Sequence, residues 1–480
     1  MASFSETRDL LRLQTMEMRL LEAQLAQPGL LSQEHVDRLR AIINLAKLTE
    51  FQPGAAYTGR RNQRPDVPVH YDEIGKLRNL TLQMLRPLRK SDDNEKLQIH
   101  AREALENLWP IAVDTRVSIL ARHINDFSAA ELNAEIGTKH LVNVGGGGGG
   151  AGFVYIGAWQ KMQESNIVPD FLIGASIGTV LGAFRARRVD TDFREEIALA
   201  KSLSPRTIFK RTTLVPRHGM PGLLRLALQR PLGQMFSNAD GSAMRIEDLE
   251  IPFEAVVAGV RKRVYERLPR ILREPESSWT RNTRFSLQVA ERMWKLTAFF
   301  APRVVKEITL GGDPITSRAN VIDALSFSAA IPAILHHEVD PTDTEMVEML
   351  DALMLQDELF ALVDGGVANN VPGRTAWRHV QRGKIGTRNC FYLGFDCFHP
   401  QLAPRHLWLW PITQGVQLQM MVNGPYMDRV VRFKPTLSPV NLMPSGDQID
   451  RAIGWGRAQI EKELPLLKAA LTPFEWPARG

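Results

Sequence analysis

A serine at position 176 lies between two glycines, in the pattern Gly174-x-Ser176-x-Gly178. An apolar run that ends at Ile173 precedes it, and a helical pattern of small residues follows it as far as Phe184. A serine on such a sharp strand-to-helix turn exposes its Oγ, and the glycines are needed because larger side chains would collide with neighbouring backbone. The helix start places a positive partial charge near a developing oxyanion. The pattern predicts a nucleophilic serine, with a chance match in a tight turn as the alternative.

A run of six glycines, Gly145–Gly150, comes directly after an apolar strand pattern at 141–144 and is followed by Ala151 and Gly152. Backbone N–H groups without side chains can approach an anion closely. The run is therefore typical of a phosphate cradle or an oxyanion hole. A flexible linker does not fit, because apolar strand and helix patterns flank the run directly.

A dinucleotide-binding loop is the other interpretation of this run, because Gly147-x-Gly149-x-x-Gly152 follows a strand and opens a helix. That fingerprint requires an acidic residue at the end of a strand about 20 residues later. Asp170 stands at that distance, but it precedes its strand. The order of the glycine run and Ser176, with the serine 24 residues after Gly152, favours an oxyanion hole.

A serine hydroxyl needs a base, and Asp364-Gly365-Gly366 after an apolar strand pattern offers one. An ordinary aspartate, with a pKa near 4, is a weak base toward serine, so it must be desolvated and held within hydrogen-bond reach. In a triad a histidine would stand between the two. Three histidines follow in the order of such a triad, none of them in a glycine-rich turn: His379, His399 and His406. A direct Ser–Asp dyad is the preferred interpretation, and a plain Asp-Gly turn is the alternative.

The composition is that of an ordinary globular protein, with 44% hydrophobic and 23% charged residues among 480. It excludes a wholly disordered chain, a collagen-like repeat and a coiled-coil rod. The apolar stretch at 171–184 is too short to span a bilayer, which needs about 20 apolar residues. The first residues carry charges where a secretory signal would be apolar. We expect a soluble, cytoplasmic protein, with peripheral membrane association and export by a non-Sec route left open.

Three regions are expected along the chain. Residues 1–138 follow helical patterns and form an N-terminal helical domain, for which a homo-oligomer contact or a regulatory partner stays open. The alternation of strand, glycine turn and helix predicts an α/β catalytic domain with a mostly parallel sheet over 139–400. Residues 401–480 are expected to form a helical extension packed on that domain. Two cysteines, Cys390 and Cys397, predict buried thiols, because a structural zinc site needs four ligands.

Positive charge is concentrated in one part of the chain. The segment 201–307 holds 20 lysines and arginines against 10 acidic residues, whereas the whole chain has a net charge of +6. Such a balance favours anionic surfaces. An insertion at about 262–305 has the pattern of a basic amphipathic helix that suits a membrane interface, with packing on the domain as the alternative. The residues expected to contact the membrane are Arg261, Lys262, Arg263 and Trp294.

Together these motifs resemble those of the patatin-like phospholipase family, over about residues 142–400. The matching stretches are Gly147–Gly152 with Ile156-Gly157, Gly174-Ala175-Ser176-Ile177-Gly178, Ser328-Ala329-Ala330-Ile331-Pro332, Asp364-Gly365-Gly366 with Asn369-Asn370-Val371-Pro372, and the lead into a central strand at Ile246–Pro252. Their order along the chain is that of the family.

The resemblance implies a three-layer α/β/α hydrolase domain, with Ser176 as nucleophile and Asp364 as general base without a histidine. It implies an oxyanion hole formed by Gly147, Gly148, Gly149 and Gly150. It assigns supporting roles to Gly152, Gly174, Gly178, Gly365 and Gly366. The implied reaction is hydrolysis of acyl esters of membrane phospholipids through an acyl-enzyme, with no metal, no organic cofactor and no nucleic-acid partner.

The sequence departs from the family at position 151, where an alanine replaces the usual arginine or lysine of the oxyanion motif. Backbone donors survive that change, but a cationic side chain that could hold a phosphate does not. A neutral-lipid lipase and a non-catalytic lipid-binding protein are therefore kept as alternatives. An oxidoreductase that uses the glycine loop for a dinucleotide would leave Ser176 inert.

Overall fold

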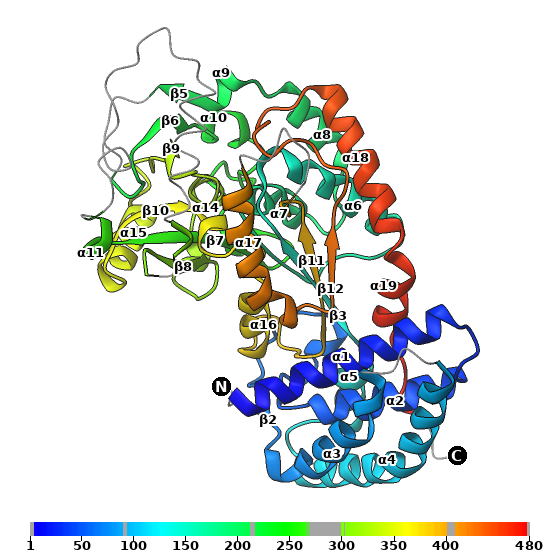
Figure 1. Ribbon diagram of the computed structural model, residues 1–480. Coiled ribbons are helices and arrows are strands. Elements are labelled where there is room, and N and C mark those ends of the chain that lie inside the picture. Colours follow the sequence, from blue (N-terminus) through cyan, green and yellow to red (C-terminus); the bar gives the residue numbers. More distant parts are fainter. Residues whose placement is uncertain are drawn as a thin grey trace.

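The computed structural model describes residues 4–89, 94–211, 217–265, 267, 299–301, 303–400 and 409–477. A seven-stranded sheet lies at its centre (Figure 1). Each strand pairs with the next in the series β10 (Leu359–Asp364), β7 (Phe253–Arg261), β4 (Phe171–Ala175), β3 (His140–Gly145), β11 (Cys390–Asp396) and β12 (Arg429–Arg432), and β8 (Val305–Leu310) also pairs with β7. The neighbours from β7 to β12 are parallel, whereas β8 and β10 run antiparallel to β7.

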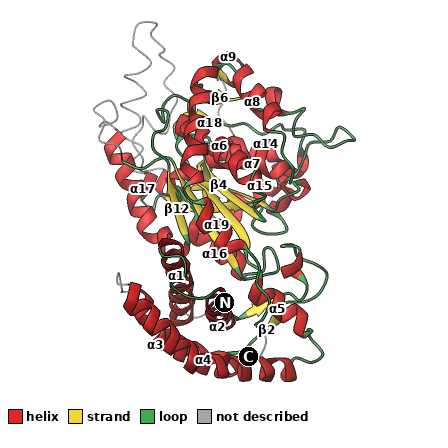
Figure 2. Ribbon diagram, turned by 90° about the vertical axis from the view of Figure 1, so that its right-hand side faces the viewer, coloured by secondary structure: helices red, strands yellow, loops and turns green. Residues whose placement is uncertain are grey.

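Helices cover both faces of this sheet, and the strands are accordingly apolar on both sides. On β4, Leu172 packs into one core cluster, whereas Phe171 and Ile173 pack into another on the opposite face. The first face lies under α6 (Val154–Gln163), α7 (Ile177–Arg187), α14 (Val321–Ser328) and α18 (Gly446–Glu461). The second lies under α16 (Gly373–Gln381) and α17 (Trp410–Asn423). The region around this sheet is thus a three-layer α/β/α domain with a mostly parallel sheet, as the sequence predicts (Figure 2).

The C-terminal part of the chain packs on this α/β/α domain and also adds strand β12 to its sheet, although the sequence pattern indicates only helices there. Helix α18 crosses α6 at close range through two glycines. A Cβ on Gly157 would lie 2.0 Å from the carbonyl oxygen of Ile453, and one on Gly456 would lie 1.8 Å from that of Val154. The last helix is α19 (Leu464–Leu471), which contacts the first helix of the chain.

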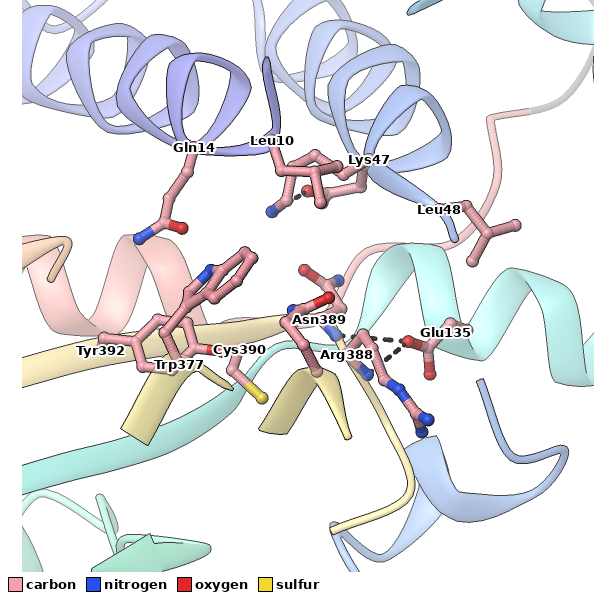
Figure 3. A pocket seen from close by; sticks show the side chains of 12 residues that line it. Leu10, Gln14, Lys47, Leu48, Glu135, Trp377, Arg388, Asn389, Cys390 and Tyr392 are labelled. Carbon is pink, nitrogen blue, oxygen red and sulfur yellow. Dashed lines mark hydrogen bonds between the residues drawn. The ribbon is translucent and has the colours of Figure 1, made fainter. Parts of the chain in front are cut away.

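The N-terminal helices lie beyond the ends at which β3 and β11 begin (Figure 1). They are α1 (Phe4–Ala26), α2 (Gln33–Lys47), α3 (Tyr71–Met84), α4 (Asn94–Arg122) and α5 (Ala129–Gly137), with the short strands β1 (Glu50–Phe51) and β2 (Val67–Pro68). Their apolar residues belong to the same continuous core as one face of the central sheet. A small cavity remains at the junction, where Glu135 of α5 accepts hydrogen bonds from the N–H groups of Arg388 and Asn389 (Figure 3).

A second sheet consists of β5 (Phe209–Arg211), β6 (Gly222–Leu226) and β9 (Ala333–His336). The further helices are α8 (Phe193–Ser202), α9 (Pro205–Ile208), α10 (Gln229–Leu232), α11 (Lys262–Tyr265) and α15 (Thr344–Gln356). In the described part of the chain, none of the helices combines the length and the apolar character that a membrane span requires.

Candidate active site

Ser176 and Asp364 are brought together because β4 and β10 both pair with β7. Ala175, the last residue of β4, pairs with Val256, and Asp364, the last residue of β10, pairs with the next residue, Val257. Both Val256 and Val257 pair with β8 on their other side, so β4 and β10 must lie on the same side of β7. Two strands that run in opposite directions therefore end facing each other. The serine that follows β4 and the aspartate that ends β10 meet at this point.

The two side chains form a direct hydrogen bond, in which Ser176 Oγ donates to Asp364 Oδ2 at 2.7 Å. The other carboxylate oxygen, Oδ1, accepts the N–H of Gly366 at 2.8 Å. Asp364 is 6% exposed, and burial raises its pKa to about 6, although the bonds from Ser176 and Gly366 oppose the rise. A carboxylate with this pKa is a stronger base than an ordinary aspartate and is still ionised at neutral pH.

Ser176 lies on a strained turn between β4 and α7, with φ of 53° and ψ of −125°. Positive φ is rare for a residue with a side chain, so the surroundings must hold it. The two flanking glycines make the turn sterically feasible. A Cβ on Gly174 would lie 2.6 Å from backbone atoms of Gly178, and one on Gly178 would lie 2.4 Å from the carbonyl oxygen of Gly145.

The hydroxyl of Ser328 holds the backbone of this turn. Its Oγ accepts the N–H of Ser176 at 2.9 Å and donates to the carbonyl oxygen of Val256 at 2.6 Å. Thr179 Oγ1 lies 2.8 Å from Ser328 Oγ and is a third hydrogen-bond partner of this hydroxyl. Ser328 is fully buried at the end of α14. The sequence marks this serine only through the family resemblance, and its position against the nucleophile emerges from the tertiary structure.

The glycine loop after β3 passes directly beside Ser176, since a Cβ on Gly147 would lie 3.0 Å from Ser176 Cβ. The four glycines expected to form the oxyanion hole differ in their bonding. The N–H of Gly147 donates to the Asn370 carbonyl oxygen at 3.1 Å, and that of Gly150 donates to the Pro439 carbonyl oxygen at 3.2 Å. Within the described part of the chain, the N–H groups of Gly148 and Gly149 have no acceptor.

These two free donors belong to residues with left-handed backbone conformations, with φ of 152° at Gly148 and 52° at Gly149. A Cβ at Gly148 would lie 2.6 Å from Cys397 Sγ, so only glycine fits there. Ala151, two residues after Gly149, is 0% exposed. Position 151 therefore presents no charge to the site and has no open space around its side chain.

A clamp from α17 holds the loop that follows Asp364. Gln419 Oε1 accepts the N–H of Asn370 at 2.8 Å, and Gln419 Nε2 donates to the Val367 carbonyl oxygen at 3.0 Å. The Asn370 carbonyl oxygen in turn accepts the N–H of Gly147. Gln419 therefore supports both the loop that follows Asp364 and the glycine loop. The sequence contains no local signal for Gln419, which lies 55 residues beyond Asp364 in an uncharged helix pattern.

The histidines weighed for a triad are engaged elsewhere or lie outside the described residues. His379 Nδ1 is 2.6 Å from Glu254 Oε2, and His399 Nε2 is 3.0 Å from the Phe433 carbonyl oxygen. His406 lies outside the described residues. The direct contact between serine and aspartate leaves no place for an imidazole between them.

Asp170, the acidic residue weighed for a dinucleotide site, stands just before β4, at the opposite end of the sheet from the glycine loop. Its Oδ2 accepts the N–H of Leu141 at 2.8 Å, so it holds two strands together at their beginnings. Among the described residues, no group of three or more histidine, cysteine, aspartate or glutamate side chains is placed to hold a metal ion. Cys390 and Cys397 are free and buried.

The residues expected to contact a membrane are only partly described. Arg261 ends β7, and Lys262 and Arg263 begin α11; all three side chains are exposed. Arg263 Nη2 lies 3.7 Å from Glu358 Oε1. Trp294 and most of the basic insertion lie outside the described residues. The membrane contact of this segment stays a prediction.

Residues 144–377 match the family model described as Patatin-like phospholipase. This range contains the glycine loop, the serine turn, Ser328 and Asp364. No match was found among curated proteins.

Proposed function

Because residues 144–377 form a patatin-like phospholipase domain, which supports a lipid acyl hydrolase in general, we propose that this protein hydrolyses acyl-ester bonds of membrane phospholipids through an acyl-enzyme on Ser176. The observation that carries this proposal is the 2.7 Å hydrogen bond from Ser176 Oγ to a buried, uncompensated carboxylate. Among the described residues no cation pairs with Asp364, so this buried carboxylate retains affinity for a proton, and the hydroxyl that donates to it lies on a strained, glycine-flanked turn.

In the acylation step, Asp364 takes the proton from Ser176 Oγ while Oγ attacks the ester carbonyl carbon. Negative charge develops on the carbonyl oxygen, which accepts hydrogen bonds from the N–H groups of Gly148 and Gly149, the two in the loop that have no acceptor among the described residues. The tetrahedral intermediate then collapses, the bond from carbon to the alcohol oxygen breaks, and Asp364 returns its proton to that oxygen. The lysolipid leaves and the acyl group stays on the serine.

Deacylation runs the same proton path with water in place of serine. The oxygen of a water molecule attacks the acyl carbon while Asp364 takes a proton from that water. The glycine loop again donates hydrogen bonds to the developing oxyanion. When the intermediate collapses, the bond to Ser176 Oγ breaks and Oγ takes the proton from Asp364. The fatty acid leaves and the hydrogen bond between serine and aspartate is restored.

Phospholipid is the preferred substrate class because the segment 201–307 carries 20 basic against 10 acidic residues. A basic surface attracts the anionic headgroups of a membrane. The uncharged, buried Ala151 favours a second candidate, a neutral-lipid lipase, because no cation stands in the glycine loop to hold a phosphate. Hydrolysis of phosphatidylglycerol vesicles against a triolein emulsion separates the two, and equal rates on both would contradict the preference for phospholipid.

The mechanism is tested by labelling with a fluorophosphonate, which reacts only with an activated serine. We expect the native chain to label, Ser176→Ala to be inert, and Asp364→Asn to label at least about 10³-fold more slowly, because the general base is lost. Thermal denaturation of each variant shows whether it is folded. An Asp364→Asn protein that labels at the native rate would remove the dyad, and a native chain that is never labelled would leave a lipid-binding protein as the better interpretation.

A further inference from the structure

Helix α17 has an apolar surface on the side that faces away from the protein. Its sequence, WPITQGVQLQMMVN, contains no charged residue. Leu418 is 66% exposed, Met421 74% and Val422 51%. These positions are i, i+3 and i+4, so the three side chains are neighbours on one face of the helix. A helix on a protein surface normally turns charged and polar residues to the outside, and α17 turns three large apolar ones.

Two other stripes of α17 contact the rest of the protein. Ile412, Val416 and Met420 are buried and form the stripe that packs on the domain. Between the buried and the exposed stripes lies a polar stripe, in which Gln419 holds the backbone at Val367 and Asn370. One turn later Asn423 donates to Asn369 Oδ1 at 2.8 Å. The exposed apolar residues therefore share their helical turns with the residues that hold the loop after the catalytic aspartate.

Positive charge lies on α16, which contacts α17 near its C-terminal end. The N–H of Arg374 donates to Asn423 Oδ1 at 3.0 Å, so this exposed arginine begins next to the last turn of α17. Arg378 is exposed one turn further along α16. Neither makes an ion pair with any other residue that the structure describes. An uncharged apolar stripe flanked by unpaired cations matches the chemistry of an anionic lipid surface, with acyl chains below a layer of negative headgroups.

We propose that the apolar stripe of α17, Leu418, Met421 and Val422, is the surface by which this protein docks on an anionic lipid bilayer. This inference rests on the proposed function, for which the substrate lies in such a bilayer. The helix lies in the plane of the interface, with the stripe in the acyl boundary and Arg374 and Arg378 at the headgroups. Docking at this helix brings the bilayer to the element that supports the loop that follows Asp364.

A fluorophore on the stripe tests the contact directly. Met421→Cys in a Ser176→Ala chain is labelled with nitrobenzoxadiazole, a reaction that the buried Cys390 and Cys397 do not compete for. Vesicles of mixed phosphatidylcholine and phosphatidylglycerol should shift its emission to the blue and increase its intensity. Leu355→Cys is the matched control: Leu355 is 83% exposed, and its helix, α15, lies across the molecule from α17 in Figure 2. An unshifted label at 421, or an equal shift at 355, would overturn the proposal.

Affinity supplies the second measurement. In the Ser176→Ala chain, Leu418→Gln with Met421→Gln should weaken sedimentation with these vesicles about tenfold or more, since two apolar side chains lose their burial. Leu355→Gln should bind as the parent does. In the active chain, the ratio of activity on vesicles to activity on a soluble short-chain ester should fall by a similar factor.

The outcomes separate this proposal from the proposed function. Vesicle binding by Ser176→Ala chains does not require hydrolysis, so an inactive protein that still docks through α17 would contradict only the proposed function. Native hydrolysis with unchanged binding of the double variant would contradict only the docking surface. If the double variant instead loses thermal stability, or sediments as a monomer where the parent is a dimer, the stripe is covered by another segment or by a second copy, and the docking proposal fails.

Discussion

Glu17 and Asp364 are both buried carboxylates, but their surroundings shift their pKa values in opposite directions. Around Glu17 stand Lys139 Nζ at 2.9 Å, Lys47 Nζ at 3.5 Å and Arg40 Nε at 3.5 Å. Burial by itself would disfavour its charge, yet these cations lower the pKa of Glu17 to about 2. Asp364 receives hydrogen bonds but no ion pair from the described residues, and burial raises its pKa to about 6.

The two carboxylates also lie at opposite ends of the central strands. The Glu17 cluster joins helix α1 to Lys139, which stands just before β3, and Lys139 Nζ also donates to Asn389 Oδ1 just before β11. It lies next to the small cavity at the junction with the N-terminal helices (Figure 3). Asp364 lies where β4 and β10 end. A carboxylate surrounded by cations is a permanent charge that connects two parts of the chain, whereas a carboxylate left without a cation remains able to take up a proton.

The largest effect is expected from removing the charge of Glu17. Glu17→Gln leaves three cations near one another in a buried site, and we expect a loss of about 3–5 kcal/mol in the free energy of unfolding. Urea denaturation measures it. Asp364→Asn is the matched comparison, because it removes a buried carboxylate that has no cation and should keep or raise the stability. Equal destabilisation by the two substitutions would contradict the distinction drawn between these sites.

A smaller effect is expected on the catalytic side from Ser328→Ala. The substitution leaves the N–H of Ser176 without its acceptor in a buried turn, which costs about 1–3 kcal/mol; if this cost falls on the transition state, it corresponds to roughly a 5–150-fold loss of kcat on a soluble ester. KM should change little, since Ser328 positions the nucleophile rather than the substrate. Ser326→Ala is the control: Ser326 is equally buried on α14, and its Oγ has no hydrogen-bond partner among the described residues. The same loss of kcat in both variants would contradict a positioning role for Ser328.

The mildest intervention is a change of pH, which separates the two carboxylates without any substitution. Asp364 must be ionised to act as a base, so the rate of fluorophosphonate labelling should fall about tenfold per pH unit below about pH 6 and reach a plateau above it. The stability contributed by Glu17 is fully present above its unfolded pKa near 4.5 and is lost only as the pH falls towards 2. Between pH 5 and 6, activity should therefore decline while circular dichroism shows an unchanged fold. A labelling rate that stays level down to pH 5 would exclude Asp364 as the titrating base.

Several parts of the site could be predicted from short stretches of sequence. The tight turn at Ser176 is predicted by Gly174 and Gly178, and the close approach of Gly174 to Gly178 acts within five residues, whereas that of Gly178 to Gly145 does not. The glycine loop and Asp364 were recognised by residue type, their order and the apolar strand patterns before them. The alternation of strands and helices predicts an α/β domain with a mostly parallel sheet, and the family resemblance implies its three layers. In each case the signal lies in residue types and their spacing along the chain.

Other parts had no local signal. Strand β12 was absent from the expected pattern because its four residues are recognisable as a strand only beside β11. Gln419 and the hydroxyl of Ser328 act on backbone groups far away in the chain. The expectation of four equivalent oxyanion donors could not show that two of the N–H groups are already bound, because their acceptors, Asn370 and Pro439, come from distant loops.

Residue types and spacings specified the chemical groups of this protein: a hydroxyl on a tight turn, a carboxylate before two glycines and a loop of bare amides. Folding decided which of these groups meet and in what state. The head-to-head arrangement of β4 and β10 along β7 places the serine against the aspartate, and the exclusion of water and cations from that place raises the proton affinity of the carboxylate. Backbone sterics act between neighbours in the chain, whereas strand register, burial and electrostatic environment arise only when distant segments pack together.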